Sequence, residues 1–591
     1  QKDNRNNINT TLRLNYDLSS LLTKGLSVHG SIAYDSYYYS RKKYSKTFPY
    51  YLARRDAEDP DYIYLIPQSE ESIWSVSTGW DKNRKVYMEF GIDYNRTFGL
   101  HKTTALILYN QSKYYSPSLQ YYVPNAYQGL VGRLTYEYAS RYLAEFNMGY
   151  NGTENFAKGK RFGFFPAVSL GWVISEEKFF PKNNIVKYLK VRGSYGEVGN
   201  DQIGGDRFLY LPSSYGAASD SGVNKYNFGL ASNPYTSLMI VENKIGNPDL
   251  TWEKAKKMNV GVDINLFNNC LTASFDIFKE KRNNILANRS TSPMIIGANL
   301  PAYNFGEMEN RGWEMDLNFR HHIQDFHYWA RFNYSFARNE IIYMDEVQKR
   351  YDYQMTTGRR KNQFFGLIFD GYYNSWEEIN ALDRPKSSWS GNQLQPGDVK
   401  YVDVNQDGVI DDYDMVPIGY TPVPEIIYGF SFGAQYKGFD FSILFQGADN
   451  VSIKYFGRSM WPFAKGEESA KSLIKERWTQ ERYEAGEKIT FPRLSLNPNG
   501  ETDHNYRPST LWIRDARYLR LKNLEVGYTF TGGFVKRLNL NSVRLYFNGS
   551  NLFTWTDVVD LDPEAPSRSG NVEINTYPLQ KVYNIGLNIN F

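Results

Sequence analysis

The sequence predicts an all-β fold, a transmembrane antiparallel β-barrel with long external loops, from three observations. Apolar and polar residues alternate in many segments of about ten residues, the length of a tilted strand that crosses a membrane. Tyr, Phe and Trp make up 16% of the 591 residues, although the chain as a whole is hydrophilic. Short and long connections alternate from about residue 85 onward. Outer-membrane barrels combine these features, because aromatic girdles mark both membrane interfaces and the long loops lie outside.

The alternation defines the expected strands in chain order. In the last strand, every second residue from Tyr583 to Phe591 is apolar, and the residues between them are Asn or Gly. Successive side chains of a strand point to opposite faces, so such a segment has one apolar and one polar face. About seventeen segments follow this pattern, near 10–18, 26–39, 86–96, 102–113, 129–138, 142–151, 164–174, 188–196, 257–267, 270–280, 310–320, 326–337, 426–436, 438–447, 517–530, 542–552 and 581–591. The stretch 61–80 is expected to add a hairpin arm to an external loop.

The connections are expected to be short at one end of the barrel and long at the other. Short turns lie at 98–100, 139–141, 268–269, 437–438 and near His322. Long connections span roughly 199–256, 285–308, 339–424, 449–515 and 554–578. A β-propeller would instead repeat about every 40–50 residues with even loops, and the sequence has no such period.

Composition and charge exclude several other classes of protein. No run of about 18 apolar residues is present, which excludes a helical membrane protein. The aromatic content excludes a disordered chain. A net charge of +4 leaves no electrostatic footprint for nucleic-acid binding. The single cysteine, Cys270, excludes an internal disulfide and is expected to be a strand residue without chemical consequence.

The odd number of expected strands indicates whether this chain forms a whole barrel or a part of one. Single-chain bacterial barrels usually have an even number of strands. If the last strand ends in the periplasm, the first one runs inward from an external loop, and several earlier strands are missing. A barrel with missing strands would leave two open edges in lipid, where unpaired backbone groups are not tolerated. We therefore expect residues 1–591 to be the C-terminal part of a larger barrel.

Several short runs, in their order and spacing, resemble one known family. They are Gly129–Tyr136, Phe164–Trp172 followed by Ile174–Glu177, Leu189–Gly196 with Gly199 and Asn200, Asn247–Glu253, Gly306–Gly312, Tyr518–Asn523, Asn551–Trp555 and Leu561–Glu564. Each run alone is weakly specific. The ordered set covers almost the whole chain and resembles the SusC family (SusC/RagA type) of TonB-dependent outer-membrane transporters from Bacteroidota.

The resemblance implies a fold and an activity. Such proteins form 22-strand barrels with an N-terminal plug and a segment that contacts TonB, and a SusD-like lipoprotein forms a hinged lid on the outer face. The pair captures oligosaccharides or peptides, and TonB with the inner-membrane proton-motive force drives their release inward. The front of this chain departs from the family, because it has no plug and no TonB box and its match begins some strands into the barrel.

By this resemblance we expect an active importer in the outer membrane that is not an enzyme and requires no cofactor. Its expected partners are a SusD-like lipoprotein, TonB through the missing N-terminal part, the rest of the barrel and plug, and membrane lipid with lipopolysaccharide, but no nucleic acid. One alternative is a barrel that anchors a surface complex for binding glycans or proteins without its own import. Another is an extracellular all-β carbohydrate-active enzyme, against which the missing catalytic constellation argues. The loops suit a glycan and a peptide equally well.

The sharpest local motif runs from Asp403 to Asp414 and fits D-x-[DN]-x-[DN]-G. Calcium needs oxygen ligands at positions one, three and five of such a loop, a backbone carbonyl at seven and a carboxylate at twelve. The corresponding residues are Asp403, Asn405, Asp407, Val409 and Asp414, with Asp411 or Asp412 to supply a bidentate contact. The twelfth residue is Asp rather than Glu and no helices are expected to flank the loop, so a plain Asx-rich turn stays open. A structural calcium would brace the loop and take no part in chemistry.

Aromatic residues in the long loops are the candidates for substrate binding, because aromatic faces stack on sugar C–H groups or on peptide side chains. Those singled out are Tyr121, Tyr122, Tyr351, Trp376, Trp389 and Trp461. For any one of them, packing within the loops or against a lid protein is the commoner role.

The remaining motifs point to little chemistry. His321 and His322 lie near an expected short turn with no third ligand in view, so a solvated turn is expected rather than a metal site. Glu176 and Glu177 are adjacent and would point to opposite faces of a strand, so they cannot form a glycosidase pair. Phe591 ends the last strand on an aromatic, and by resemblance it looks like the signal that the barrel-assembly machinery reads.

Overall fold

The fold is known from a computed structural model. It describes residues 1–55, 59, 61–202, 207–212, 216–217, 225–230, 235–238, 240–241, 245–291, 300–389, 394–455, 461–463, 472–495, 503–564 and 579–591. In this part of the chain, no helix has both the length and the apolar character needed to cross a membrane.

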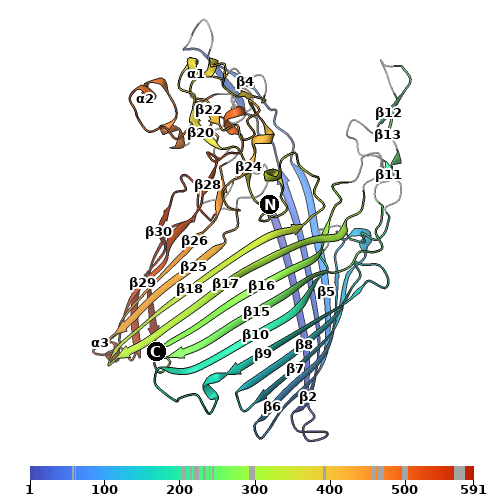
Figure 1. Ribbon diagram of the computed structural model, residues 1–591, viewed down its shortest axis with the longest axis vertical. Helices are drawn as coiled ribbons and strands as arrows, with labels where there is room; N and C mark the ends of the chain where they lie inside the picture. Colours follow the sequence, from blue (N-terminus) through green and yellow to red (C-terminus); the bar gives the residue numbers. More distant parts are fainter. Residues whose placement is uncertain are drawn as a thin grey trace.

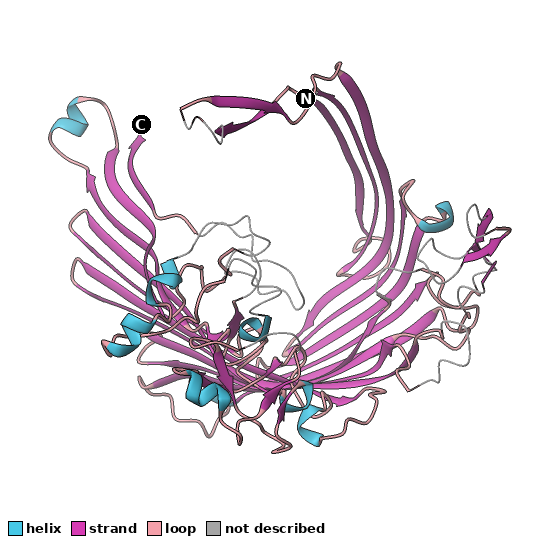
Figure 2. Cartoon of the chain, turned by 90° about the horizontal axis from the view of Figure 1, so that it is seen from above, coloured by secondary structure: helices cyan, strands magenta, loops and turns pink. Residues whose placement is uncertain are grey.

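Seventeen strands form one antiparallel sheet that curves into a tall wall (Figure 1). They are β1 (Lys2–Asp17), β2 (Leu26–Ser45), β5 (Ser75–Phe98), β6 (His101–Tyr115), β7 (Asn125–Tyr138), β8 (Tyr142–Thr153), β9 (Phe162–Val173), β10 (Val186–Asn200), β15 (Glu253–Leu266), β16 (Leu271–Ala287), β17 (Tyr303–Ile323), β18 (Phe326–Tyr343), β25 (Ile426–Tyr436), β26 (Phe439–Asp449), β29 (Tyr518–Phe530), β30 (Ser542–Thr556) and β31 (Val582–Asn590). Each strand pairs with the next in this order, and Figure 2 shows the wall from above as an open arc. Among the described residues, β1 pairs only with β2 and β31 only with β30. All seventeen expected strands are confirmed.

The expected hairpin arm lies earlier in the chain than 61–80. β3 (Tyr51–Arg55) and β4 (Ile63–Pro67) form the arm, whereas residues 75–80 belong to β5. The pairing of β5 with β2 extends to Ser75 opposite Ser45. β2 and β5 thus stay paired over more residues than a strand needs to cross a membrane. Backbone hydrogen bonds continue the ladder beyond the apolar segment, where the side chains are polar.

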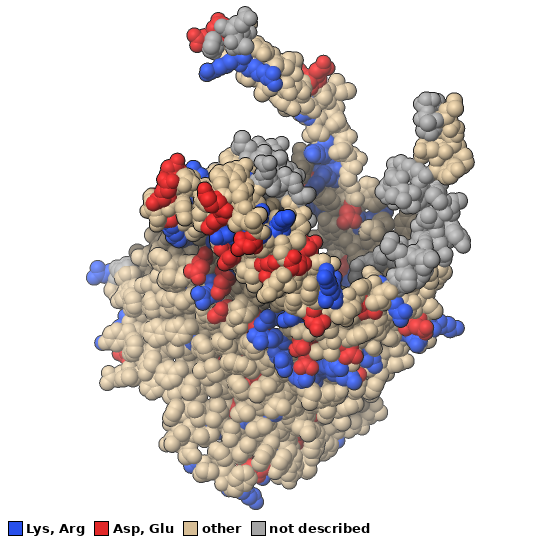
Figure 3. Space-filling view, turned by 45° about the horizontal axis from the view of Figure 1, so that its top comes forward, with Lys and Arg blue, Asp and Glu red and all other residues tan. Residues whose placement is uncertain are grey.

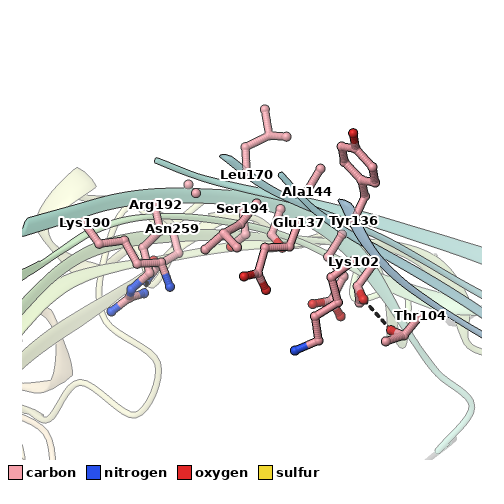
Figure 4. Close-up of a pocket in the computed structure, with 16 residues that line it drawn as sticks. Lys102, Thr104, Tyr136, Glu137, Ala144, Leu170, Lys190, Arg192, Ser194 and Asn259 are labelled. Carbon is pink, nitrogen blue, oxygen red and sulfur yellow. Dashed lines mark hydrogen bonds between the residues drawn. The ribbon is translucent and has the colours of Figure 1, made fainter. Parts of the chain in front are cut away.

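Alternation divides the wall into an outer apolar face and an inner polar face. On β7, Leu130, Leu134 and Tyr136 are exposed, and on β31, Ile585 is 81% exposed. Such exposure is unfavourable in water and favourable in a lipid bilayer, which is the surrounding that the sequence predicts for this face. Figure 4 shows the two faces side by side, with Tyr136 and Leu170 on one side of the sheet and Lys190 on the other.

Short turns close one end of the wall. Ala139 and Ser140, between β7 and β8, have φ of 51° and 59°. Such left-handed pairs match the twist of two-residue hairpins. Cys270 lies in the turn before β16, not inside a strand as expected, and its carbonyl accepts a hydrogen bond from the backbone of Arg320 at 2.7 Å. β16 begins only at Leu271, because the turn at Phe267 and Asn268 occupies the preceding residues.

The connections between β18 and β25 and between β26 and β29 fold into a separate unit at the other end, here called the loop assembly (described residues of 344–425 and 450–517; Figure 1). Its elements are β19 (Phe365–Gly366), β20 (Phe369–Tyr372), α1 (Trp376–Asn380), β21 (Lys386–Ser387), β22 (Val399–Tyr401), β23 (Val409–Ile410), β24 (Val416–Pro417), β27 (Ser452–Lys454), α2 (Gln480–Glu484) and β28 (Ile513–Asp515). They pack around a buried apolar core that includes Leu367, Tyr455, Phe491 and Trp512.

The other elements are small. β11 (Gly216–Ala217) pairs with β14 (Ile240–Val241), β12 (Lys225–Phe228) pairs with β13 (Tyr235–Leu238), and α3 (Phe534–Arg537) lies between β29 and β30. Figure 1 shows β12 and β13 in an arm beyond the edge of the wall.

Candidate functional site

The inner face of the wall carries a polar recess of about 410 Å³. Strands β6 to β10 and β15 line it with side chains that alternation turns inward, because every second residue of each strand faces the lumen. Figure 4 shows Lys102, Glu137, Lys190, Arg192 and Asn259 on the same side of the sheet. Both signs of charge and an amide are therefore presented to the lumen, which suits contact with a polar solute.

On the inner face, two arginines each connect three neighbouring strands through hydrogen bonds to carboxylates, and each such group is called a clamp here. Arg192 of β10 donates to Asp276 of β16 at 2.7 Å and to Asp263 of β15 at 3.1 Å. It passes over Gly261, where an added Cβ would lie 2.7 Å from the guanidinium carbon. Glycine is thus required at this position by a close approach rather than by a turn. The clamp binds two inward carboxylates and holds the register of three strands.

The second clamp repeats this arrangement on the other side of the wall. Arg544 of β30 donates to Glu525 of β29 at 2.7 Å and to Asp440 of β26 at 2.9 Å. Its path crosses Gly527, which is paired with Asp440 in the register. The inner face is therefore polar, and at both clamps two carboxylates share one guanidinium.

The six aromatic candidates do not converge on one surface. Trp461 packs on Tyr506 with ring centroids 4.7 Å apart, and Trp389 lies against the loop core with Arg507 over its ring at 4.6 Å. Both have the packing role that was the commoner expectation for loop aromatics. The sequence reasoning had no signal for this, because loop packing depends on contacts distant in the chain.

The other four aromatic candidates lie at three separate places. Tyr121 and Tyr122 are exposed and both have φ of 56°, in the 3₁₀ turn Gln120–Tyr122. Trp376 is exposed at the start of α1. Tyr351 stacks on Tyr353 with ring centroids 5.2 Å apart, beside the Asp-rich loop. A substrate-binding role for these residues stays a prediction.

The Asp-rich loop is closed by its own hydrogen bonds. The carboxylate of Asp403 accepts from the backbone N–H groups of Gln406 at 2.7 Å and Gly408 at 2.8 Å. Asn405 Oδ1 accepts from the N–H of Asp407 at 3.0 Å, and Asp407 Oδ1 accepts from the N–H of Val409 at 2.9 Å. Position six is Gly408 with φ of 81°, which permits the sharp turn.

The last residue of the loop is buried. Asp414 is 0% exposed, and it accepts backbone N–H groups from Val404 at 2.8 Å and Asp411 at 2.9 Å. Its pKa is raised, chiefly by burial. In the described part of the chain, no three His, Cys, Asp or Glu side chains lie close enough to hold a metal ion. The six predicted ligands share one loop, and calcium binding there stays a prediction.

A buried polar network in the loop assembly was not anticipated from the sequence. His504 is 3% exposed, and its Nε2–H donates to the carbonyl of Val399 at 2.8 Å. Because a carbonyl only accepts, Nδ1 is the acceptor and takes the hydroxyl proton of Ser387 at 2.9 Å. Burial is the main cause of a lowered pKa for His504, so the ring is neutral. The network joins strands distant in sequence and has a structural role.

Two of the quoted motifs meet at one buried arginine. Arg520 of β29 is 2% exposed on the inner side of the wall. It donates to Asp562 at 2.8 Å, to Glu564, and to Thr554 Oγ1 at 2.9 Å. Tyr518 also donates to Glu564 at 2.7 Å. The chain after β30 is thus tied back to the wall.

The histidines near the tight turn lie in a strand. His321 and His322 belong to β17, and the turn itself follows at Gln324 and Asp325. His322 is paired with His327 of β18, with ring centroids 5.5 Å apart. The structure thus adds a second imidazole on the same side, which the sequence reasoning missed because the register was not known.

Comparison with known proteins shows the family. A family model described as TonB dependent receptor-like, beta-barrel matches residues 1–552. TonB-dependent receptor P3 of Formosa agariphila is 28% identical over 479 residues, which cover 78% of this chain and 45% of that protein. TonB-dependent receptor SusC of Bacteroides thetaiotaomicron is 28% identical over 477 residues, covering 80% of this chain and 44% of that protein. The chain spans less than half the length of these relatives.

The solved structure of the RagAB peptide transporter shares the fold. It has a TM-score of 0.71 at 20% sequence identity and covers 100% of this chain and 62% of its own. The motif resemblance is confirmed by these matches. Proteins of this family are outer-membrane transporters rather than enzymes. An apolar outer face, a polar inner face and a family match that extends from the first residue to β30 lead to one conclusion: the chain belongs to the TonB-dependent receptor-like β-barrel family.

Proposed function

We propose that this chain is the barrel portion of an active importer of the SusC/RagA type, which takes oligosaccharides or peptides across the outer membrane. The observation that carries the proposal is the family match over residues 1–552 on a wall with an apolar exterior and a polar interior. Such a wall separates a hydrated path from lipid. TonB supplies the energy through a part of the protein outside this chain.

The inner face supports a polar cargo. The recess between β6 and β15 presents lysine, glutamate and asparagine side chains, and Arg192 in this recess and Arg544 elsewhere on the inner face each form ion pairs with carboxylates. Hydroxyl-rich oligosaccharides and peptide backbones both find donors and acceptors there. The solved relative RagAB is described as a peptide transporter, which keeps peptides among the candidate cargoes.

We further propose that additional strands complete the wall between β31 and β1. Both edge strands are exposed, and each has one described neighbour. An open strand edge in hydrocarbon leaves backbone N–H and C=O groups without partners, which costs several kcal/mol per group, on the order of the desolvation of an amide. The remainder of the barrel and its plug are the natural partners at these edges.

A SusD-like lipoprotein is the proposed partner on the outside. The loop assembly offers it a folded platform, on which Trp376 and Leu382 are exposed near α1. Figure 3 shows Lys, Arg, Asp and Glu side chains mixed over this end of the molecule. A lid protein would find aromatic and charged contacts together there, as protein interfaces use them.

The test is uptake by cells that carry the complete gene or lack it. Fluorescent oligosaccharides and fluorescent peptides of matched length are supplied with and without a protonophore. Import requires the gene and the proton-motive force for at least one of the two cargo classes. Surface binding that persists without accumulation inside, and that ignores the protonophore, would support the anchor alternative and reject import.

A crosslinking variant tests the partner separately. A photo-crosslinker in place of Leu382 should capture a lipoprotein of the same membrane, identified by mass spectrometry. The control places the crosslinker at Leu134 in the lipid-facing wall. Capture of the same protein from both positions, or of no lipoprotein from position 382, would contradict the proposed contact.

A further inference from the structure

The outer face of β5 to β9 changes character between two adjacent rows of paired residues. One row consists of five large apolar or aromatic side chains, paired in register: Phe90, Tyr109, Leu130, Tyr150 and Phe164. The next row toward the long loops consists of Met88, Gln111, Gln128, Gly152 and Phe162. Both rows occupy the same alternate positions of their strands as the exposed residues of the wall, so their side chains face outward. The apolar belt therefore gives way to amides at this line.

A groove of about 530 Å³ lies along the second row and the residues beyond it. Gly152 supplies part of its floor, since an added Cβ there would come within 2.5 Å of the ring of Phe162. That ring lies across the glycine and stacks on Tyr150, with ring centroids 5.1 Å apart at 15°. The floor of the groove is thus a rigid aromatic surface that continues the apolar row.

Two cations at this groove have no carboxylate partner. Lys113, paired with Val86, and Arg161, just before β9, both line the groove and are exposed. Among the described residues, neither forms an ion pair, and the Nε of Arg161 donates only to the carbonyl of Phe156 at 3.1 Å. An anion is therefore the ligand that this pair would accept.

The one carboxylate at the groove is already neutralised. Glu154 accepts from Arg207 at 2.6 Å and from the backbone N–H of Ala126 at 2.9 Å. Gln111 donates to the sulfur of Met88 at 3.3 Å, a weak acceptor that leaves amide capacity for a stronger one. The groove thus combines positive charge with free donor capacity.

Outward lysines on β16 provide the contrast. Lys279 is 2.9 Å from Glu309, and Lys281 is 2.9 Å from Glu307, both on β17. These cations lie on the same outer face above the apolar rows, but each forms an ion pair with a carboxylate of the neighbouring strand β17. The outward lysines of β16 are therefore paired with carboxylates, whereas the two cations at the groove on β5 to β9 are not.

We propose that the groove on β5 to β9 binds a phosphorylated glycolipid of the outer leaflet. Its phosphate groups contact Lys113 and Arg161, the amides of Gln111 and Gln128 donate to them, and its acyl chains lie on the aromatic row. A soluble anion would gain nothing from the apolar row, and an uncharged lipid would leave the cations unpartnered. The inference rests on the orientation given by the proposed function, with the long loops outside, but not on import.

The experiment uses the complete protein in nanodiscs of stated composition, and lipid retention is measured by native mass spectrometry. The lipids are phosphatidylcholine alone, or with bis-phosphorylated lipid A, or with dephosphorylated lipid A. Only the phosphorylated form is expected to stay bound. The variant Lys113→Gln/Arg161→Gln should lower its affinity about 30-fold, at roughly fivefold per cation. Lys113→Arg/Arg161→Lys, which keeps both charges, should retain binding.

The matched control is Lys279→Gln/Lys281→Gln, which removes two outward lysines that are ion-paired. It should leave lipid A binding unchanged. Equal losses in both glutamine variants, or equal retention of dephosphorylated lipid A, would overturn the proposal. Displacement of the lipid by inorganic phosphate at equal concentration would instead assign a simple phosphate site. Because the assay does not measure uptake, a failure here is distinguishable from a failure of the importer proposal.

Discussion

The barrel wall and the loop assembly place the same residue types in opposite surroundings. In the wall, large apolar side chains point outward and stay exposed, as Leu134 does at 48%. In the loop assembly, Trp512 and Phe491 are 1% and 0% exposed. The difference follows from the medium that each region contacts, which is lipid for the wall and water for the loops. Large apolar side chains therefore point outward in the wall, where lipid surrounds them, and inward in the loop assembly, where water does.

The two regions also differ in how they satisfy their polar groups. The wall satisfies its backbone in long ladders, and on its inner face the two arginine clamps pair charged side chains across strands. The loop assembly has short strands and relies on side chains such as Asn505, whose amide donates to Asp398 at 2.8 Å and whose Oδ1 accepts from the N–H of Val399 at 2.9 Å. Its stability therefore depends on a few buried side chains, and that of the wall on the register of the whole sheet.

The largest loss of stability is expected for Trp512→Ala in the loop assembly. Removal of a buried indole should destabilise the loop assembly by about 4 kcal/mol, because it leaves a cavity. Limited proteolysis should then cut the loops while the wall keeps its resistance. The control Trp376→Ala, at 53% exposure, should change stability by less than about 0.5 kcal/mol. Simultaneous loss of the wall would contradict the independence of the two regions.

The contact between the wall and the connection that follows β30 is tested by Arg520→Leu. The change leaves Asp562 and Glu564 without their cation near the inner wall, which should cost about 3 kcal/mol. Proteolysis between β30 and β31 should become faster. Restoring a cation with Arg520→Lys should recover part of the protection, because a lysine reaches fewer acceptors than a guanidinium. Equal protection in the leucine and wild-type proteins would show that the contact is dispensable.

The outer face of the wall is tested by Leu134→Arg. A charge that faces the middle of the bilayer should destabilise the barrel by about 2 kcal/mol. Unfolding in urea from lipid vesicles measures this. The neighbouring change Thr135→Arg points into the recess of the inner face and should have a smaller effect. The inverse order of effects would reverse the assignment of inner and outer faces.

A pH titration should separate the regions further. Burial lowers the pKa of His504, so the folded loop assembly holds the neutral ring. As the pH falls below about 6.5, the unfolded chain binds a proton before the folded one does, and stability decreases by up to about 1.4 kcal/mol per pH unit. Stability is full above that pH. The unfolding midpoint of the loops should follow this trend, and His504→Gln should flatten it.

The smallest expected effect concerns the Asp-rich loop. We propose that calcium braces residues 403–414, with Asp403 and Asp407 as ligands. Calcium should raise the unfolding midpoint of the loop assembly without changing that of the wall, because a ligand that binds only the folded form stabilises it. Asp403→Asn should abolish the shift. The loop is already closed by backbone hydrogen bonds, so absence of a shift in the unmodified protein would identify a plain turn.

Local alternation was sufficient to predict the wall, whereas the loops needed more. The segment 583–591 shows its strand in every second residue, and β31 spans Val582–Asn590. The extension of β5 to Ser75 was missed, because polar residues outside the membrane lose the apolar period while the backbone pairing continues. Trp389 and Trp461 were equally ambiguous, since whether a loop aromatic binds cargo or fills a core depends on distant neighbours.

The sequence by itself determined the strand order, the two faces of the wall and the family, because these follow from a period of two and from ordered motifs. The tertiary structure alone decided which residues meet across the register. It placed Arg520 against Asp562 and Glu564. It also aligned Gln111, Gln128 and Gly152 into one outward row. The physical reason is that alternation sets where a side chain points, whereas strand register and loop packing set what it touches.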